Sequence, residues 1–162
     1  MNYYTRNSNL NYYIEHCEQA NCGSFALRIN EWYDLDTPFE NYTGMPIESW
    51  INKGVFENDS TDLEMSELYA AILVGRILDD FEEDIRLIDS SSEVKSNEEL
   101  IAFRAYIHYD ESVGYTDWDY HFKVYRDGHW QEKNGDCEVH DCDEDDWGDY
   151  VSDTYYFAKN LS

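Results

Sequence analysis

Basic residues are scarce in this chain of 162 residues, which has 11 Lys and Arg against 36 Asp and Glu. The resulting net charge of −25 argues against direct binding to nucleic acid or anionic membranes, because like charges repel. A surface this negative favours basic partners, because it steers their encounter and complements their charge. The same charge could also serve solubility alone.

Long apolar runs are absent too, and none approaches the ~20 residues that a membrane-spanning helix needs. The first residues, 1–4, lack the basic and then hydrophobic segments of a signal peptide. We therefore expect a cytoplasmic protein, whose four cysteines are free thiols, a catalytic thiol or metal ligands. Apolar residues still make up 42% of the chain, which is enough for one folded domain with a sizeable core.

Proline is rare, and both prolines fall within residues 34–46, a segment that we expect to be a loop. Before this loop, Asn21 is a suitable N-cap for a helix that ends near Tyr33. Cys22 then lies in the first helical turn, where the positive end of the helix dipole favours a thiolate. The spacing puts it on the apolar face of this helix, together with Phe25, Ile29 and Trp32.

Hydrophobic periodicity predicts the remaining elements. Thr61 and Glu64 form a capping box at the start of a helix over residues 61–85, and residues 47–56 suggest a short helix. Later, the apolar pattern changes to alternation, which predicts strands over 101–109, 118–126 and 154–159. This is an α+β domain, with an irregular arm or edge strand over 1–20, a helical part over 21–85 and an antiparallel sheet over 86–162.

Asp127 and Gly128 are a strong signal for a two-residue hairpin turn. The turn sets the register of the strand before it with residues 129–134. In this register Tyr125 lies opposite Trp130, and His121 lies opposite Asn134.

The run Asn-Cys-Gly-Ser-Phe-Ala-Leu at 21–27, with Tyr-His-Phe at 120–122 and Asp-Gly-His-Trp at 127–130, resembles small papain-like cysteine-peptidase domains of the NlpC/P60 kind. Such domains occur widely in bacteria and their phages. The resemblance implies a papain-like arrangement, with Cys22 as nucleophile, His121 as base and Asn134 as a candidate orienting group. The alternative is that Cys22 is a core residue and His121 a hydrogen-bonded strand histidine.

A second cluster, Cys137-x-x-His140-x-Cys142, holds three soft or borderline ligands at a spacing that suits zinc. Cys22 and His121 could complete such a site if they reach the same end of the sheet. The expected zinc ligands are Cys22, His121, His140 and Cys142, with Cys17 and Cys137 as less favoured alternatives. Zinc and catalysis are competing uses of Cys22, because a closed four-ligand site would silence the thiol.

Carboxylates concentrate at the end of the second helix and in residues 136–149, an acidic loop with eight carboxylates and no Lys or Arg. We expect these residues to occupy a basic surface of a host protein where phosphates otherwise lie. The residues expected to bind this partner are Asp79, Asp80, Glu82, Glu83, Asp84, Asp141, Asp143, Glu144, Asp145 and Asp146.

In size, charge and lack of localisation signals, the chain is similar to phage anti-CRISPR proteins that block RNA-guided nucleases. This similarity implies an acidic inhibitor that mimics nucleic acid and competes for a CRISPR effector nuclease. We expect the zinc site described above to stabilise it. We favour the inhibitor because charge is a property of the whole chain, whereas catalysis depends on two residues. The alternative is a papain-like cysteine hydrolase that uses Cys22 and His121.

Overall fold

A computed structural model describes residues 10–35, 62–110, 112 and 115–161, and the structural statements below concern this part of the chain. Its helices are α1 (Leu10–Glu15), α2 (Cys22–Leu27) and α5 (Asp62–Phe81), with 3₁₀ turns at η1 (Cys17–Gln19), η2 (Glu82–Asp84) and η3 (Ser91–Glu93). Its strands are β1 (Ile85–Ile88), β2 (Glu98–Asp110), β3 (Tyr115–Arg126), β4 (His129–Lys133), β5 (Val139–Asp141) and β6 (Tyr155–Asn160).

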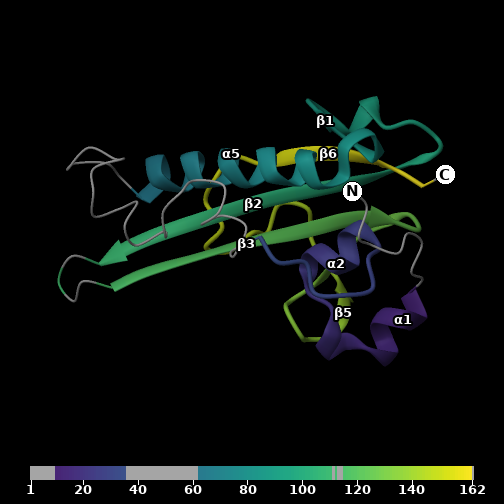
Figure 1. The fold of residues 1–162 in the computed structure, drawn as a ribbon, viewed down its shortest axis with the longest axis horizontal. Coiled ribbons are helices and arrows are strands. Elements are labelled where there is room, and N and C mark those ends of the chain that lie inside the picture. The colour runs from purple at the N-terminus through teal and green to yellow at the C-terminus, as the bar shows by residue number, and fades with distance from the viewer. Residues whose placement is uncertain (1–9, 36–61, 111, 113–114, 162) are drawn as a thin grey trace.

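The six strands form one antiparallel sheet in the order β1-β6-β2-β3-β4-β5, which confirms the α+β class. Figure 1 shows α5 running along β2 and β6, whereas α1 and α2 lie together beyond β3, near β5. Both α2 and α5 pack on the same core, in which Phe25 and Leu73 meet Phe103 and Phe122 of the two central strands. No helix of the described residues is long and apolar enough to cross a membrane.

A cation of the sheet holds part of the acidic loop. Lys123 is buried, and its ammonium donates to the backbone carbonyls of Asp143 and Asp146. The ring of Trp147 covers this ammonium at 4.4 Å and the Arg104 guanidinium at 5.1 Å. The chain therefore supplies its own positive charges beneath the loop.

The predicted hairpin is confirmed. Asp127 and Gly128 adopt φ angles of 54° and 85°, the left-handed conformation that this turn requires. Tyr125 pairs with Trp130, and their rings meet edge to face at 5.6 Å. The strands predicted from alternation correspond to β2, β3 and β6.

The start of the chain differs from expectation. Residues 10–19 are helical, in α1 and η1, where we expected an irregular arm or an edge strand. The reason is Tyr13, which is fully buried and donates its hydroxyl proton toward the carbonyls of Ser24 and Ile29.

The two predicted helices were too long. The first ends at Leu27, because Arg28 turns left-handed at φ 59° and its N–H caps the helix by donating to Ser24 O. The second ends at Phe81, and the residues after η2 form the edge strand β1 instead of a last helical turn. The predicted helix 47–56 and the capping residue Thr61 lie outside the described residues.

Candidate active site

Cys22 is the first residue of α2, and a capping box fixes that start. The Ser24 N–H donates to the Asn21 side-chain oxygen at 2.9 Å, and the Asn21 N–H donates to the Ser24 hydroxyl at 3.2 Å. The Asn21 side-chain amide also donates to Tyr33 O at 2.7 Å. The predicted N-cap is therefore confirmed, and it ties the start of α2 to the segment that follows the helix.

Gly23 lets this helix start lie close to the sheet. A Cβ atom at this position would lie 2.8 Å from a ring carbon of Tyr33 and 3.1 Å from one of Phe122. β4 pairs with residues 124–126 of β3. Along the earlier residues of β3, therefore, no described strand lies on the edge that faces β4. α2 begins there, with the Cys22 sulfur 4.0 Å from the carbonyl oxygen of Tyr120.

His121 lies beside Cys22 and is held by a carboxylate. Its Nε2 atom is 2.7 Å from Oε2 of Glu132, and both side chains are largely buried. Cys22 lines the same cleft as His121, and Nδ1 is the ring nitrogen that Glu132 does not occupy. Cys22, His121 and Glu132 thus bring a thiol, an imidazole and a carboxylate together, and Glu132 holds the place that we expected of Asn134.

The electrostatics of Cys22, His121 and Glu132 favour a protonated imidazole. Burial by itself would lower the pKa of His121, but hydrogen bonds and charge interactions with Cys22 and Glu132 raise it to about 9. Burial likewise would raise the pKa of Glu132, but the bond to His121 lowers it. The site therefore pairs an imidazolium with a carboxylate near neutral pH, and a positive charge beside a cysteine is what a thiolate nucleophile needs.

Tyr150 covers the histidine ring. It stacks on His121 with ring centroids 5.3 Å apart and an interplanar angle of 26°, and it donates its hydroxyl proton to Asp119 at 2.9 Å. Trp147 approaches the same imidazole edge-on at 6.1 Å. The loop after β5 therefore shields the ring that Glu132 orients.

Cys22 and His121 open onto a cleft of about 370 Å³. Asn134 and Gly135 line it beyond β4, and Trp32 and Asp119 line it as well. A nucleophile beside an imidazole at the wall of an open cleft can react with a carbonyl group that enters the cleft.

No family model, curated protein or solved structure matches this chain.

Two of the predicted zinc ligands, His121 and His140, contact Glu132. Nε2 of His140 lies 2.9 Å from Oε1 of this carboxylate, so both histidines use Nε2 for it. Burial, and then the nearby Glu132 charge, raise the pKa of Cys142 to about 11, which keeps this thiol protonated. Among the described residues, no group of three or more His, Cys, Asp and Glu side chains is placed to hold a metal. Zinc stays a prediction.

All four cysteines are free thiols. Cys17 and Cys137, the less favoured ligands, lie near Lys133, as does Cys22. Burial lowers the pKa of Lys133, and interactions with these cysteines offset part of this lowering. The Lys133 ammonium donates to the carbonyls of Cys17, Ala20 and Gly135. This lysine thereby joins η1 to the end of β4, below the cleft.

The acidic residues expected to bind a partner fall into two groups. One group precedes the edge strand β1. The other begins in the edge strand β5 and continues in the loop that Lys123 of β3 holds over the sheet. Some of these residues have partners within the chain: Asp80 accepts from Tyr33 and Arg76, Asp141 pairs with His129, and Glu144 accepts from Tyr156. Asp79, Glu82, Glu83, Asp143, Asp145 and Asp146 are exposed, and Asp84 is half-buried.

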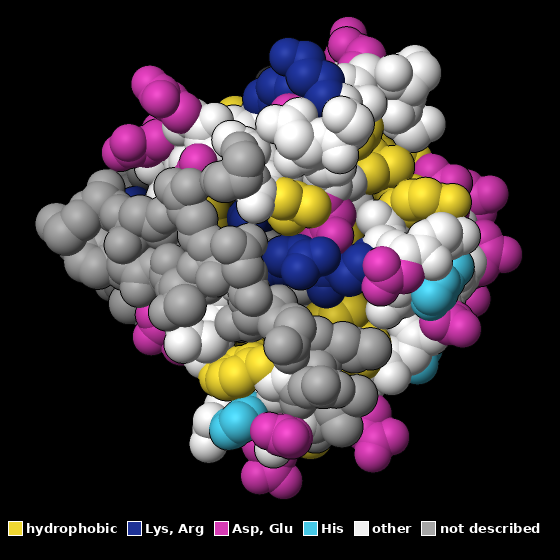
Figure 2. Space-filling view, turned by 90° about the vertical axis from the view of Figure 1, so that its right-hand side faces the viewer, with side chains coloured by type: hydrophobic (Ala, Val, Ile, Leu, Met, Phe, Trp, Pro, Cys, Tyr) yellow, Lys and Arg dark blue, Asp and Glu magenta, His cyan; other side chains and the backbone are white. Residues whose placement is uncertain are grey.

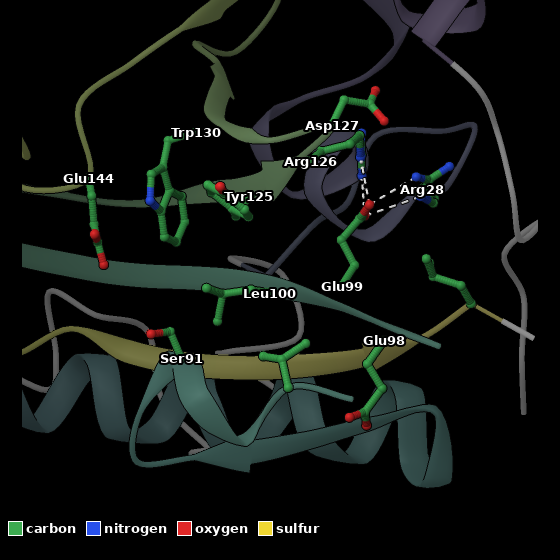
Figure 3. A pocket seen from close by; sticks show the side chains of 12 residues that line it. Arg28, Ser91, Glu98, Glu99, Leu100, Tyr125, Arg126, Asp127, Trp130 and Glu144 are labelled. Carbon is green, nitrogen blue, oxygen red and sulfur yellow. Dashed lines mark hydrogen bonds and ion pairs between the residues drawn. The ribbon is translucent and has the colours of Figure 1, made fainter. Parts of the chain in front are cut away.

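A second cavity, of about 660 Å³, lies at the other end of α2. Figure 2 shows basic side chains gathered in the middle of one face, with acidic side chains around its margin. In the cavity, Glu99 accepts from Arg28 at 2.9 Å and from Arg126 at 2.6 Å, as Figure 3 shows. Among the described residues no cysteine or histidine lines it, so the reactive groups belong to the smaller cleft.

Proposed function

We propose that this protein is a cysteine hydrolase with a papain-like arrangement, which cleaves an amide bond in the cleft beside Cys22. The observation that carries the proposal is the grouping of Cys22, His121 and Glu132 in one site. The thiol begins a helix, and Oε2 of Glu132 holds Nε2 of the imidazole at 2.7 Å. The raised pKa of His121 supports the same roles, because an imidazolium is poised to give up a proton to a leaving group.

The reaction follows from these groups. The Cys22 thiolate attacks the amide carbonyl carbon, and a C–S bond forms. As the C–N bond breaks, the imidazolium of His121 gives its proton to the leaving amine, and a thioester remains. Neutral His121 then takes a proton from water, whose oxygen attacks the thioester. This step releases the carboxylic acid and restores the thiolate and the imidazolium.

Two further groups assist these steps. Glu132 holds the imidazole and stabilises its protonated form, which is the role of the third residue in a catalytic triad. The backbone N–H of Cys22, at the first helical position, has no acceptor within the helix. It can therefore donate to the oxyanion that forms during the attack.

The experiment that tests this proposal needs no known substrate. We expect iodoacetamide at pH 6 to alkylate Cys22 at least about tenfold faster than Cys137, because only a thiolate reacts quickly under these conditions. Mass spectrometry of the peptides gives both rates in one sample. Cys137 is the control because it is exposed and does not line the cleft, whereas Cys22 is 6% exposed. Faster alkylation of Cys137 would overturn the proposal.

The acidic inhibitor is the second candidate, and the net charge of −25 supports it. It ranks second because several of the acidic side chains that it needs already have partners within the chain: Asp80, Asp141 and Glu144. The variant Cys22→Ser separates the two functions. An inhibitor keeps its salt-sensitive binding to a basic RNA-guided nuclease in this variant, whereas a hydrolase loses its activity.

A further inference from the structure

One charged side chain stands in the cleft beside the reactive pair. Cys22 and His121 apart, Asp119 is the charged side chain among the described residues that line the cleft. These residues include no lysine or arginine. Asp119 is exposed, and it lies on β3 two residues before His121. Its side chain therefore faces the same side of the strand as the histidine.

Two hydrogen bonds fix this carboxylate. Its Oδ2 atom accepts from the Tyr150 hydroxyl at 2.9 Å, and its Oδ1 atom accepts from the Tyr120 N–H at 2.8 Å. Burial, followed by the charge of Asp119, raises the pKa of Tyr150 above its usual range, so this tyrosine remains a neutral donor. Tyr150 also stacks on His121. The anion is therefore held at a set place relative to the catalytic ring.

Trp32 gives the cleft an aromatic wall. Its side chain is 48% exposed, although a large ring usually gains by burial. Indole rings bind cations through their negative faces, and a fixed carboxylate in the same cleft adds direct charge attraction. An anionic substrate would instead meet Asp119 and the net charge of −25.

We infer that the cleft binds a substrate with a positive charge beside the scissile amide, as in a lysine or arginine peptide, and that Asp119 and Trp32 are its specificity-determining residues. This inference rests on the proposed function for the scissile amide. The cationic subsite itself depends only on the residues that line the cleft.

Charged thiol reagents test the subsite without any hydrolysis. Two methanethiosulfonates of similar size, one with a trimethylammonium group and one with a sulfonate, each transfer a thioalkyl group to the Cys22 sulfur and release methanesulfinate. We expect the cationic reagent to modify Cys22 at least about tenfold faster than the anionic reagent, relative to the same ratio at Cys137. In Asp119→Asn, this excess should fall severalfold. The asparagine oxygen can still accept from the Tyr120 N–H, and its amide can donate to the Tyr150 hydroxyl oxygen.

Asp117→Asn is the matched control. Asp117 lies on the same strand and also accepts a tyrosine hydroxyl proton, from Tyr106 at 2.8 Å, but it lines a different cavity. Asp117→Asn removes the same charge from the whole molecule as Asp119→Asn. It should leave the excess of the cationic over the anionic reagent at Cys22 unchanged. Equal losses in both variants would mean a diffuse field and would overturn the inference, as would equal rates of the two reagents in the unmodified protein.

Peptides extend the test to specificity. In quenched fluorogenic peptides that differ only in a residue flanking the cleaved amide, we expect kcat/KM to fall from Lys to norleucine to Glu. In Asp119→Asn the ratio of the Lys value to the norleucine value should fall severalfold. Equal cleavage of the Lys and norleucine peptides would overturn the inference and leave the hydrolase in place. Slow alkylation of Cys22 at pH 6 would instead overturn the hydrolase.

Discussion

At the scale of single residues, Glu132 decides the geometry of the candidate site. Its two oxygens contact different imidazoles, His121 at 2.7 Å and His140 at 2.9 Å. The carboxylate is 14% exposed, so little water competes for it. One acidic side chain thus fixes the imidazole ring that the proposed mechanism uses for proton transfer.

Replacing Glu132 by glutamine should flatten the pH dependence of stability. The pKa of His121 is raised from 6.5 to about 9, so its protonated form stabilises the fold fully below pH 6.5. That contribution is lost as pH rises through about 9. We expect the free energy of unfolding to fall over this range in the unmodified protein and to fall less in Glu132→Gln. Urea unfolding at several pH values measures both.

The exposed Glu138 provides the control for this experiment. Glu138→Gln removes the same charge from the neighbouring segment but leaves the imidazole contacts intact. Its pH dependence should match that of the unmodified protein. If Glu132→Gln also gave the same slope, the carboxylate would not be what raises the pKa of His121.

Gly23→Ala should destabilise the protein by about 1–3 kcal/mol, the usual cost of overpacking a core. The added methyl group would lie 2.8 Å from the Tyr33 ring, so the start of α2 must move away from β3. We therefore also expect slower alkylation of Cys22. Gly128→Ala is the control, because its added methyl group meets no atom within 4 Å. It strains the hairpin turn but should leave the alkylation rate of Cys22 unchanged.

The sequence predicted part of this site and missed its third member. The cap at Asn21 and the order of cysteine and histidine were readable from local signals, and the structure brings Cys22 and His121 together. The ideal hairpin register pointed to Asn134, but β4 ends at Lys133 and Gly135 turns left-handed at φ 53°. Glu132 reaches His121 diagonally instead, and long side chains make such contacts without any periodic signal.

At the scale of elements, α2 is held at both ends. Its start is fixed by the capping box at Asn21. Its end is fixed by Arg126, which donates to the carbonyl of Phe25 at 3.1 Å and lies over the Phe25 ring at 4.7 Å. Glu99 joins Arg126 to Arg28 just beyond the helix. A helix of only 6 residues needs such anchors, because short helices are marginal alone.

Glu99→Ala should destabilise the protein by about 3–5 kcal/mol, because it leaves Arg126 without its carboxylate at a buried site. Glu98→Ala is the matched control on the adjacent residue. Glu98 pairs with Arg86, which is 40% exposed, so water can replace the lost partner and the cost should be much smaller. Chemical denaturation of both variants measures the difference. Equal costs would mean that the buried ion pairs do not anchor α2.

The strands were easier to predict than the helix ends. Alternation identified β2, β3 and β6 because alternate side chains of each strand pack into the main hydrophobic core. β1 directly follows a run of carboxylates that fits the end of a helix, and pairing with β6 decides its conformation. The contact of Lys123 with the acidic loop was also missed. These residues are far apart in the sequence, and only the folded sheet brings them together.

At the scale of the whole molecule, repulsion among 36 acidic side chains opposes the compact state. We expect the melting temperature to rise by several degrees when ionic strength increases from about 0.01 M to about 0.15 M, because the screening length falls from about 30 Å to about 8 Å. Differential scanning fluorimetry at pH 7 measures this change. A neutral osmolarity control with sucrose separates screening from exclusion effects. A melting temperature that falls with salt would show that attractive pairs outweigh the repulsion.

The order of Cys22, His121 and Glu132 in the sequence also has a consequence for synthesis of the protein. The ribosome makes the sulfur nucleophile early and the two groups that activate it late. Until β3 and β4 have been translated and paired, the nascent polypeptide carries an ordinary thiol. In the proposed hydrolase, reactivity would therefore arise only in the finished fold, and the growing chain and the proteins around it would be spared premature cleavage.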